Sequence, residues 1–428
     1  MLNRSVVSAT LAFAALLSCF PARAQTPNPP EIPVNYEESQ VATYVLPDPL
    51  VLTNGEKVRD SDTWFSKRRP EILRLFETNM HGKSPGRPEA MTFDVFDKGT
   101  PALDGKALRR QVTVNFSGSK SGPKMDIVLY LPADAAKPVP LLLCLNFSAN
   151  AVADTGAREG EVWGRDKTRM PAAKGLGYGK LQIDKFLAHG FGVATIYYGD
   201  IDPDFAGGIP HGVRSVFLKP GQKEPAPDEW GSIAAWAWGL SRAMDYLETD
   251  SGVDAKRVAI LGVSRLGKTV LWAGAHDTRF AMVIASCSGE GGASLSRRNY
   301  GETVKHLNAR FGYQFAGNYQ NFGGQVDRLP VDSHMLLALI APRPVYLSTG
   351  DLDRWSDPKG EFLAAVAAEP VHQLLGKQGL GTAQMPSAGQ PVMHTIGYHM
   401  HAGGHGTNPS DWEHYLEFLN LHFAQAKK

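Results

Sequence analysis

One stretch constrains this chain more than any other: a short apolar strand, a serine between two glycines and a helix follow one another over residues 257–275. The pattern Gly-X-Ser-X-X-Gly between a strand and a helix is a nucleophile elbow, with its second glycine one place later than in the commoner form. Gly262 and Gly267 remove side chains where strand and helix must approach closely. The helix N-terminus then aims N–H groups at an oxygen that becomes negative during acyl transfer. The stretch predicts that Ser264 is a nucleophile; the alternative is a serine in an ordinary strand-to-helix turn.

The first 24 residues have the features of a cleaved signal peptide. Arg4 supplies a basic start, residues 6–20 are apolar but short for a membrane span, and residues 22–24 read Ala-Arg-Ala. Cleavage after residue 24 predicts a secreted or periplasmic protein. An N-terminal membrane anchor, or a lipoprotein modified at Cys19, is the alternative. The Pro-rich residues 25–35 are expected to form an extended leader.

The chain that remains carries almost no net charge, because loss of Arg4 and Arg23 changes +1 to −1. It therefore has no basic field for nucleic acid and no polybasic patch for a membrane surface. No later apolar run in the sequence is long enough for a transmembrane helix. Only Cys144 and Cys287 remain after cleavage. They allow one disulfide at most, and they exclude a disulfide scaffold.

Strand and helix patterns alternate along residues 36–428, which we expect to form a single domain with a doubly wound, mainly parallel α/β sheet. Apolar or alternating runs predict strands at 108–116, 125–131, 139–147, 192–198, 257–261, 280–286, 345–349 and 392–398. Helical spacing predicts helices at 64–80, 184–189, 233–248, 335–340 and 412–424. Residues 288–332 show no strand pattern and are too long for a plain connection. We interpret them as an insertion that shapes a substrate cleft.

A serine nucleophile needs a base, and in α/β-hydrolases the histidine follows the last strand. Residues 398–406 offer three candidates, His399, His401 and His405. His405 lies between glycines, in a loop that can fold over the top of the sheet, and it is the preferred base. A metal site built from the three histidines is an alternative. The acidic loop 198–204 is a second possible metal site, although solvated loop carboxylates are commoner.

The carboxylate that orients the histidine is expected just past the strand 345–349. The loop there contains Asp351, Asp353 and Asp357, each of which could instead cap a turn. Glu290, which follows the strand 280–286, is a fourth candidate. The residues alone leave these four open.

These motifs resemble a known family. Residues 262–268, Gly-Val-Ser-Arg-Leu-Gly-Lys, are similar to the Gly-Cys-Ser-Arg-X-Gly-Lys elbow of glucuronoyl esterases, carbohydrate esterase family 15, with Val263 in place of the usual Cys. Residues 288–293 resemble that family's Ser-Gly-X-Gly-Gly-Ala segment. The spacing of Asp353 and Trp355 and the glycine-flanked His405 match bacterial members. The resemblance covers most of the chain from about residue 36 onward.

The resemblance implies an α/β-hydrolase fold and a serine esterase that cleaves esters of (4-O-methyl-)glucuronic acid, such as those linking glucuronoxylan to lignin. Arg265 would add its guanidinium to the oxyanion hole. Lys268 and Glu302 would bind sugar hydroxyls, and Trp355 would border the sugar. A monomer that uses no cofactor and no metal is expected, with a polysaccharide ester as its partner.

The chain departs from the fungal members at one position. They carry the acid directly before the Ser-Gly-X-Gly-Gly segment, where this chain has Cys287. A thiol cannot orient a histidine as a carboxylate does, so the acid is placed at Asp353, with Glu290 as the alternative. Two other functions stay open. One is an acetyl xylan or other short-chain carbohydrate esterase with the same triad, and the other is a non-catalytic carbohydrate-binding relative.

Overall fold

The computed structural model describes residues 31–149, 152, 154–173 and 181–423. The predicted signal peptide and most of the predicted leader lie outside the described residues. The chain divides into residues Met1–Pro33 and a unit of Val34–Lys428.

One large sheet organises the described part of this unit. Its strands stand in the order β1-β2-β3-β7-β4-β8-β9-β10-β12-β11. Their bounds are β1 Thr92–Ala102, β2 Ala107–Asn115, β3 Lys124–Pro132, β4 Val139–Asn146, β7 Gly192–Tyr197, β8 Val253–Val263, β9 Met282–Ser286, β10 Val345–Gly350, β11 Val392–Met393 and β12 Ile396–His401. A separate hairpin pairs β5, Glu161–Trp163, with β6, Arg169–Pro171.

The six strands from β7 to β12 along this order are parallel, and the pairs at the two edges are antiparallel. The parallel strands are largely buried runs of apolar residues, as strands covered on both faces should be. Because β8, β9, β10 and β12 are parallel neighbours, the loops after their carboxyl ends emerge along one edge of the sheet. This confirms the predicted α/β architecture and sets the position of the site.

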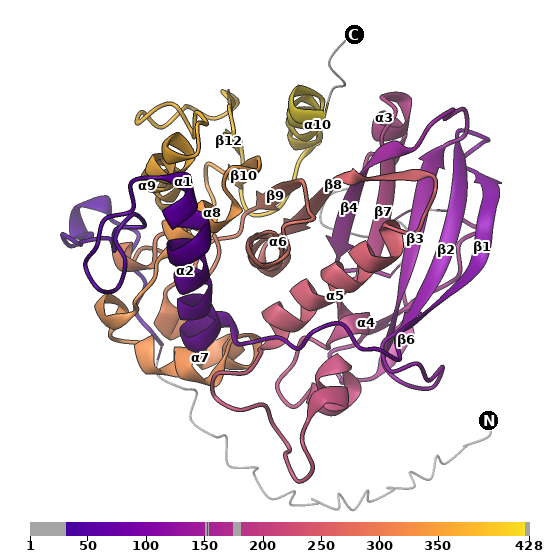
Figure 1. The fold of residues 1–428 in the computed structure, drawn as a ribbon, viewed down its shortest axis with the longest axis horizontal. Helices are drawn as coiled ribbons and strands as arrows, with labels where there is room; N and C mark the ends of the chain where they lie inside the picture. Colours follow the sequence, from indigo (N-terminus) through magenta and orange to yellow (C-terminus); the bar gives the residue numbers. More distant parts are fainter. Residues whose placement is uncertain (1–30, 150–151, 153, 174–180, 424–428) are drawn as a thin grey trace, which may run out of the picture. The chain divides into compact units, whose positions relative to one another are not determined.

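Helices cover both faces of the sheet. Their bounds are α1 Ser61–Thr63, α2 Arg69–Phe76, α3 Ile183–Ala188, α4 Tyr198–Ile201, α5 Ser232–Leu247, α6 Arg265–His276, α7 Val304–Phe311, α8 Ser333–Ile340, α9 Pro358–Leu374 and α10 Pro409–Phe423. In Figure 1, α5 and α6 lie on one side of the sheet, and α3 and α10 lie on the other. Two apolar clusters match this division: one contains residues of α5, α6, α8 and α9, and the other contains residues of α3 and α10.

Two predicted elements differ from the structure. The helix expected at 64–80 is a continuous helical stretch that already begins with α1, and it includes two π-helical segments, Trp64–Arg68 and Glu77–His81. The strand expected at 392–398 is divided into two: β11 has two residues, and the last parallel strand, β12, begins at Ile396 and continues past the predicted end to His401. The histidines of β12 made its end look like a loop, although they are buried and paired.

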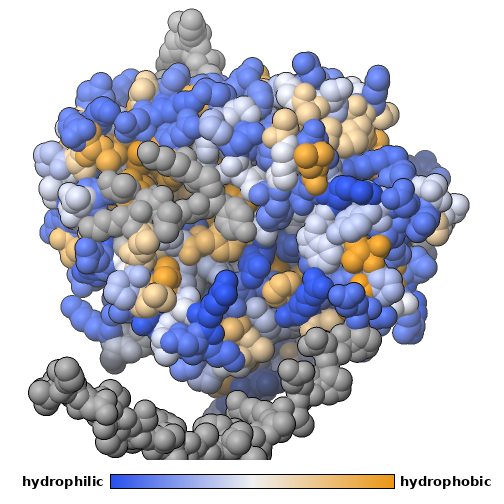
Figure 2. Space-filling view, turned by 180° about the vertical axis from the view of Figure 1, so that it is seen from behind, coloured by the Kyte–Doolittle hydropathy of each residue, from blue (hydrophilic) through white to orange (hydrophobic). Residues whose placement is uncertain are grey.

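The surface is polar with scattered apolar side chains. Figure 2 shows one face on which hydrophilic residues dominate and apolar residues form small separate patches. Within the described residues, no helix combines the length and apolarity that crossing a bilayer requires. The large hydrophobic side chains that are exposed lie far apart in the sequence, from Val45 to Leu421.

Candidate active site

Ser264 lies at a sharp turn between β8 and α6. Its φ of 60° and ψ of −128° place it in a region that L-residues rarely adopt, as a nucleophile elbow requires. The two flanking glycines are needed for the steric reason that the sequence predicted, because strand and helix approach closely at both positions. A Cβ on Gly262 would lie 2.2 Å from the carbonyl oxygen of Leu266, and one on Gly267 would lie 2.9 Å from the carbonyl oxygen of Ser286. Larger residues at either position would open the turn.

The candidate histidine and the candidate acid lie in the loops after β12 and β10. His405 Nδ1 lies 2.7 Å from Asp353 Oδ2. Burial raises the pKa of Asp353, but the hydrogen bonds from His405 and Ser356 outweigh it, and the pKa stays below the ordinary value of 3.8. The Asp353 side chain is only 2% exposed, whereas that of His405 is 34% exposed. The pair therefore joins a fixed buried carboxylate to an imidazole that solvent and substrate can reach.

A single cavity of about 270 Å³ connects these groups to the serine. All seven residues predicted for the triad, the oxyanion hole and the sugar site line it: Ser264, His405, Asp353, Arg265, Lys268, Glu302 and Trp355. Cys287, Leu307, Arg310, Phe311, Gln314 and Ser356 complete the lining. The insertion at 288–332 supplies five of the thirteen lining residues and has no named strand, as the sequence predicted.

The alternative acid, Glu290, lies elsewhere. It is 3% exposed and is not a lining residue of the cavity. It accepts hydrogen bonds from the hydroxyl groups of Ser296 at 2.5 Å and Tyr319 at 3.4 Å. Burial is the main cause that raises its pKa to about 8. A carboxyl group in this state suits a structural contact in the core.

Arg265 is held by a carboxylate that the sequence did not single out for this purpose. Its Nη1 donates to Asp204 Oδ2, and its guanidinium lies 5.1 Å from the centre of the Phe311 ring. Asp204 also accepts from the hydroxyl groups of Tyr198 at 3.0 Å and Tyr313 at 2.8 Å. Burial lowers the pKa of Arg265, but the charge of Asp204 outweighs it and the net shift is upward. The arginine is therefore a fixed cation at the cavity wall.

The acidic loop 198–204 does not gather its carboxylates around one point. Asp200 pairs with Arg169 at 2.6 Å, Asp202 pairs with Arg214 at 2.9 Å, and Asp204 pairs with Arg265. The metal site considered for this loop is thus not assembled in the described residues. The local contact with Tyr198 does not set Asp204 apart in the sequence, because its other partners, Arg265, Tyr313 and Gln314, lie about 60 to 110 positions away.

The sugar-binding candidates line the same cavity. Lys268 Nζ lies 3.7 Å from Glu302 Oε2, and both side chains are under 10% exposed. The Glu302 amide donates to the carbonyl oxygen of Trp355 at 2.9 Å, which ties the insertion to the acid loop. The guanidinium of Arg310 lies 5.4 Å from the Trp355 ring centre. A paired cation and carboxylate beside an aromatic ring can bind hydroxyl groups and the apolar face of a sugar.

Cys287, at the position where the resemblance to fungal members implies an acid, contacts the histidine loop. Its Sγ donates to the carbonyl oxygen of Gly406 at 3.3 Å and accepts from the Gly406 N–H at 3.4 Å. Burial raises its pKa to about 12, so the thiol stays protonated. Both Cys144 and Cys287 are free and buried, so the disulfide that the sequence allowed is not formed.

The three histidines do not form one metal-binding cluster in the part of the chain that the structure describes. His399 and His401 both bond Asp411, at 2.7 and 3.1 Å, whereas His405 bonds Asp353. His399, His401 and Asp411 lie close together, and His405 lies outside that group beside Asp353 and Cys287. The three-histidine site considered from the sequence is therefore wrong.

The sheet and the elbow define a carboxylic ester hydrolase with the α/β-hydrolase fold. Three comparisons with known proteins narrow this class. Residues 225–376 match the sequence model of a family described as "Glucuronyl esterase, fungi". The carbohydrate esterase MZ0003, from an unknown prokaryotic organism, is 46% identical over 402 residues, which are 91% of this chain and 92% of that protein.

Two solved structures are similar as well. A glucuronoyl esterase from Solibacter usitatus is 49% identical, with a TM-score of 0.87 over 90% of this chain and 100% of that one. A promiscuous CE15 esterase from a marine bacterial metagenome is 46% identical, with a TM-score of 0.85 over 91% of this chain and 100% of that one. The chain belongs to carbohydrate esterase family 15, the glucuronoyl esterases, and the resemblance seen in the sequence is confirmed.

Proposed function

We propose that this esterase cleaves esters of glucuronic acid in glucuronoxylan, including its links to lignin, with Ser264, His405 and Asp353 as its triad. The observation that carries the proposal is the 2.7 Å contact between His405 Nδ1 and Asp353 Oδ2, in a cavity that Ser264 also lines. The substrate class rests on the similarity to a solved glucuronoyl esterase.

In the first half of the reaction, Ser264 Oγ attacks the ester carbonyl carbon and gives its proton to His405 Nε2. Asp353 accepts the Nδ1–H and stabilises the imidazolium that forms. The carbonyl oxygen becomes an oxyanion in the tetrahedral intermediate. The carbon–oxygen bond to the alcohol then breaks, and His405 gives its proton to the leaving alcohol. The product is a glucuronoyl ester of Ser264.

In the second half, a water molecule gives a proton to His405 and attacks the acyl-enzyme. The bond to Ser264 Oγ breaks, and the serine recovers its proton from His405. The released acid is a glucuronate. The two halves use the same base in opposite directions, so no further acid or base is required.

Arg265 supports the oxyanion. The ion pair with Asp204 fixes its guanidinium at the cavity wall next to Ser264. A charged donor placed in advance lowers the barrier without reorganising, and one such donor contributes roughly 3–4 kcal/mol. Lys268, Glu302 and Trp355 are proposed to bind the sugar ring, and their contacts are made before as well as during the reaction.

We also propose that the chain is exported and acts as a monomer. Export rests on the signal-peptide pattern of residues 1–24, which lie outside the described residues. A monomer is supported by the small, separate apolar patches on the face shown in Figure 2, because stable dimers usually bury a contiguous apolar patch.

A direct comparison of two substrates tests the proposal. We expect the enzyme to hydrolyse a benzyl glucuronate ester far faster than acetylated xylan, and Ser264→Ala to remove both activities. Faster release of acetate than of benzyl alcohol would instead support the runner-up, a short-chain carbohydrate esterase. That second candidate has one observation in its favour, since a solved relative at 46% identity is described as a promiscuous esterase.

A further inference from the structure

His401 stands at the end of β12, directly before the loop 402–406 that carries His405. Its side chain is only 4% exposed. Its Nδ1 lies 3.1 Å from Asp411 Oδ1 in the first turn of α10, and its Nε2 lies 3.0 Å from the carbonyl oxygen of Gly404. One imidazole ring therefore bridges a helix to the residue that precedes His405.

The chemistry of the two partners fixes the protonation of this ring. A carbonyl oxygen and a carboxylate oxygen are acceptors, and neither can donate a hydrogen bond. A neutral imidazole carries one N–H and can satisfy only one of them. Both contacts are hydrogen bonds only when His401 is an imidazolium, which donates from both nitrogens.

His399, two residues earlier on the same strand, provides the contrast. Its Nε2 lies 2.7 Å from the same Asp411, but its Nδ1 lies 2.9 Å from the hydroxyl group of Tyr346, which can donate. A neutral ring with its hydrogen on Nε2 satisfies both contacts. The burial of His399 lowers its pKa despite the nearby carboxylate. Asp411 therefore accepts hydrogen bonds from a neutral histidine, His399, and from a charged one, His401.

The charged groups around His401 favour its cationic form. Asp411 faces it from α10, and Asp351 faces it from the loop after β10, while His399 lies on its own strand. Burial lowers the pKa of His401, but the contacts with Asp411 and Gly404 and the charge of Asp351 outweigh it, and the pKa lies above the ordinary 6.5. Asp411 itself accepts from His399, His401 and the Asn408 N–H, and its pKa is lowered to about 2.

We propose that the imidazolium of His401 is a positioning group for His405, which ties the loop 402–406 to α10 and releases it on deprotonation. The inference rests on the proposed role of His405 as the base. His401 does not touch the reacting atoms, and it acts by holding Gly404 in place. The same loop is held on its other side by the Gly403 N–H, which donates to Asp351 Oδ1 at 2.8 Å.

The sign of the pH effect follows from the charged state. The bridge is complete at pH values where His401 is protonated, and it is lost as the pH rises through the raised pKa of His401. kcat should then fall on the alkaline side.

The charge of His401 can be measured without reference to activity. In ¹⁵N-histidine-labelled enzyme, the His401 signals, assigned by their loss in His401→Gln, should show both ring nitrogens protonated at pH 7. They should titrate above pH 6.5, and a neutral His401 tautomer at pH 7 would overturn the proposal. This measurement tests the inference separately from the proposed function, because the protonation of His401 is measured without any substrate.

The pH profile of kcat tests the positioning role. Glutamine can keep one donor but cannot titrate, so His401→Gln should lower kcat by about fivefold to tenfold at pH 7, as expected for one lost hydrogen bond. Its alkaline limb should disappear while KM changes little. His422→Gln, on α10 but bonded to the carbonyl oxygen of His394, is the matched control and should keep the wild-type profile.

Asp411→Asn provides a second variant, which keeps one acceptor oxygen for the histidines, removes the charge and replaces the oxygen that accepts from the Asn408 N–H by an amide nitrogen. It should move the alkaline limb to lower pH by about one unit or more. A purely structural role for His401 would lower the melting temperature of His401→Gln and leave the limb in place. An alkaline limb that keeps its position in both variants would overturn the proposal.

Discussion

The two loops that carry the proposed triad partners Asp353 and His405 are held in different ways. The acid loop, residues 351–357, is fixed by ion pairs and buried side chains, with Asp353, Ser356 and Asp357 each under 5% exposed. The histidine loop, residues 402–406, contains three glycines, and Ala402, Gly404 and His405 are exposed. The proposed acid is therefore held buried in its loop, and the proposed base is held in an exposed, glycine-rich loop.

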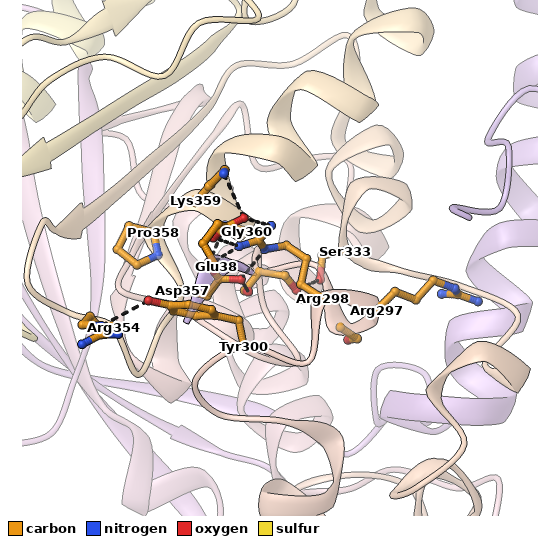
Figure 3. A network of polar contacts seen from close by, with 12 residues as sticks. Glu38, Arg297, Arg298, Tyr300, Ser333, Arg354, Asp357, Pro358, Lys359 and Gly360 are labelled. Carbon is orange, nitrogen blue, oxygen red and sulfur yellow. Dashed lines mark hydrogen bonds and ion pairs between the residues drawn. The ribbon is translucent and has the colours of Figure 1, made fainter. Parts of the chain in front are cut away.

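Figure 3 shows the ionic anchor of the acid loop. Arg298 donates to Asp357 Oδ2 at 2.7 Å and to Glu38 Oε2 at 2.8 Å, and Lys359 donates to Glu38 at 2.8 Å. Arg354 also donates to the carbonyl oxygen of Tyr36 and to the hydroxyl group of Tyr300. The insertion and the segment around Glu38, about 260 positions apart in the sequence, thus hold the loop between them.

The histidine loop depends on a few polar contacts made largely by its own backbone. Gly403 contacts Asp351 and Leu352, Gly404 contacts His401, and Gly406 contacts the thiol of Cys287. Because the two loops are held differently, mutations in them should have different effects. Loosening the acid loop should cost stability first, and loosening the histidine loop should cost turnover first.

The largest effect is expected from the acid itself. Asp353→Asn keeps the shape but favours the wrong histidine tautomer, so kcat should fall by roughly 10³- to 10⁴-fold while the fold is retained. Glu290→Gln is the matched control, because Glu290 is buried outside the cavity, and it should lose far less. Steady-state kinetics on a benzyl glucuronate ester measure kcat of both variants. A larger loss in Glu290→Gln than in Asp353→Asn would show that Glu290, on the earlier loop, is the acid.

A smaller loss of turnover is expected from Cys287→Ala. This change removes both contacts to Gly406 and leaves the carboxylate and the imidazole untouched. We expect kcat to fall by about threefold to tenfold, the range of one net hydrogen bond, with a small change in melting temperature. Cys144→Ala, at a buried thiol on β4, is the comparison. If Cys144→Ala lowers kcat as much, the contact with Gly406 is not the cause.

The smallest effect on turnover is expected from Glu38→Gln, which weakens the anchor of the acid loop. Bonding to Arg298 is the main cause that lowers the pKa of Glu38 from 4.5 to about 2. The carboxylate therefore stabilises the fold above pH 4.5, and this stabilisation is lost as the pH falls from 4.5 towards 2.

Because Glu38 is partly exposed, we expect its contribution at pH 7 to be about 1 kcal/mol. Urea titrations of wild type and Glu38→Gln at pH 7 and pH 4 measure it. The difference in unfolding free energy should shrink at pH 4, and kcat at pH 7 should change less than about twofold. An equal difference at both pH values would contradict the ionic account.

The sequence predicted those parts whose signal is local. Buried apolar runs such as Val139–Asn146 and Val345–Gly350 mark central strands, and the strained turn at Ser264 follows from its two glycines. The motif order predicted which loops would carry the acid and the base. These predictions needed only neighbouring residues and the order of elements along the chain.

What the sequence did not reveal depends on partners that are distant along the chain. Asp204 was seen as part of an acidic loop, because its pairing with Arg265 and Tyr313 exists only in the folded state. The end of β12 looked like a loop, because its buried histidines are compensated by Asp411 on the following helix. The contact of Cys287 with Gly406 spans 119 positions. Polar residues therefore wrongly suggest an exposed loop where they are buried and paired with a distant partner.

The proposed mechanism requires that Ser264 is the residue that becomes acylated. The most direct measurement is labelling with a serine-reactive phosphonate, followed by mass spectrometry of the peptides, in wild type, Ser264→Ala and Asp353→Asn. We predict one label on the peptide that contains Ser264, no label in Ser264→Ala and much slower labelling in Asp353→Asn. A label on another residue, or wild-type esterase activity in Ser264→Ala, would contradict the account.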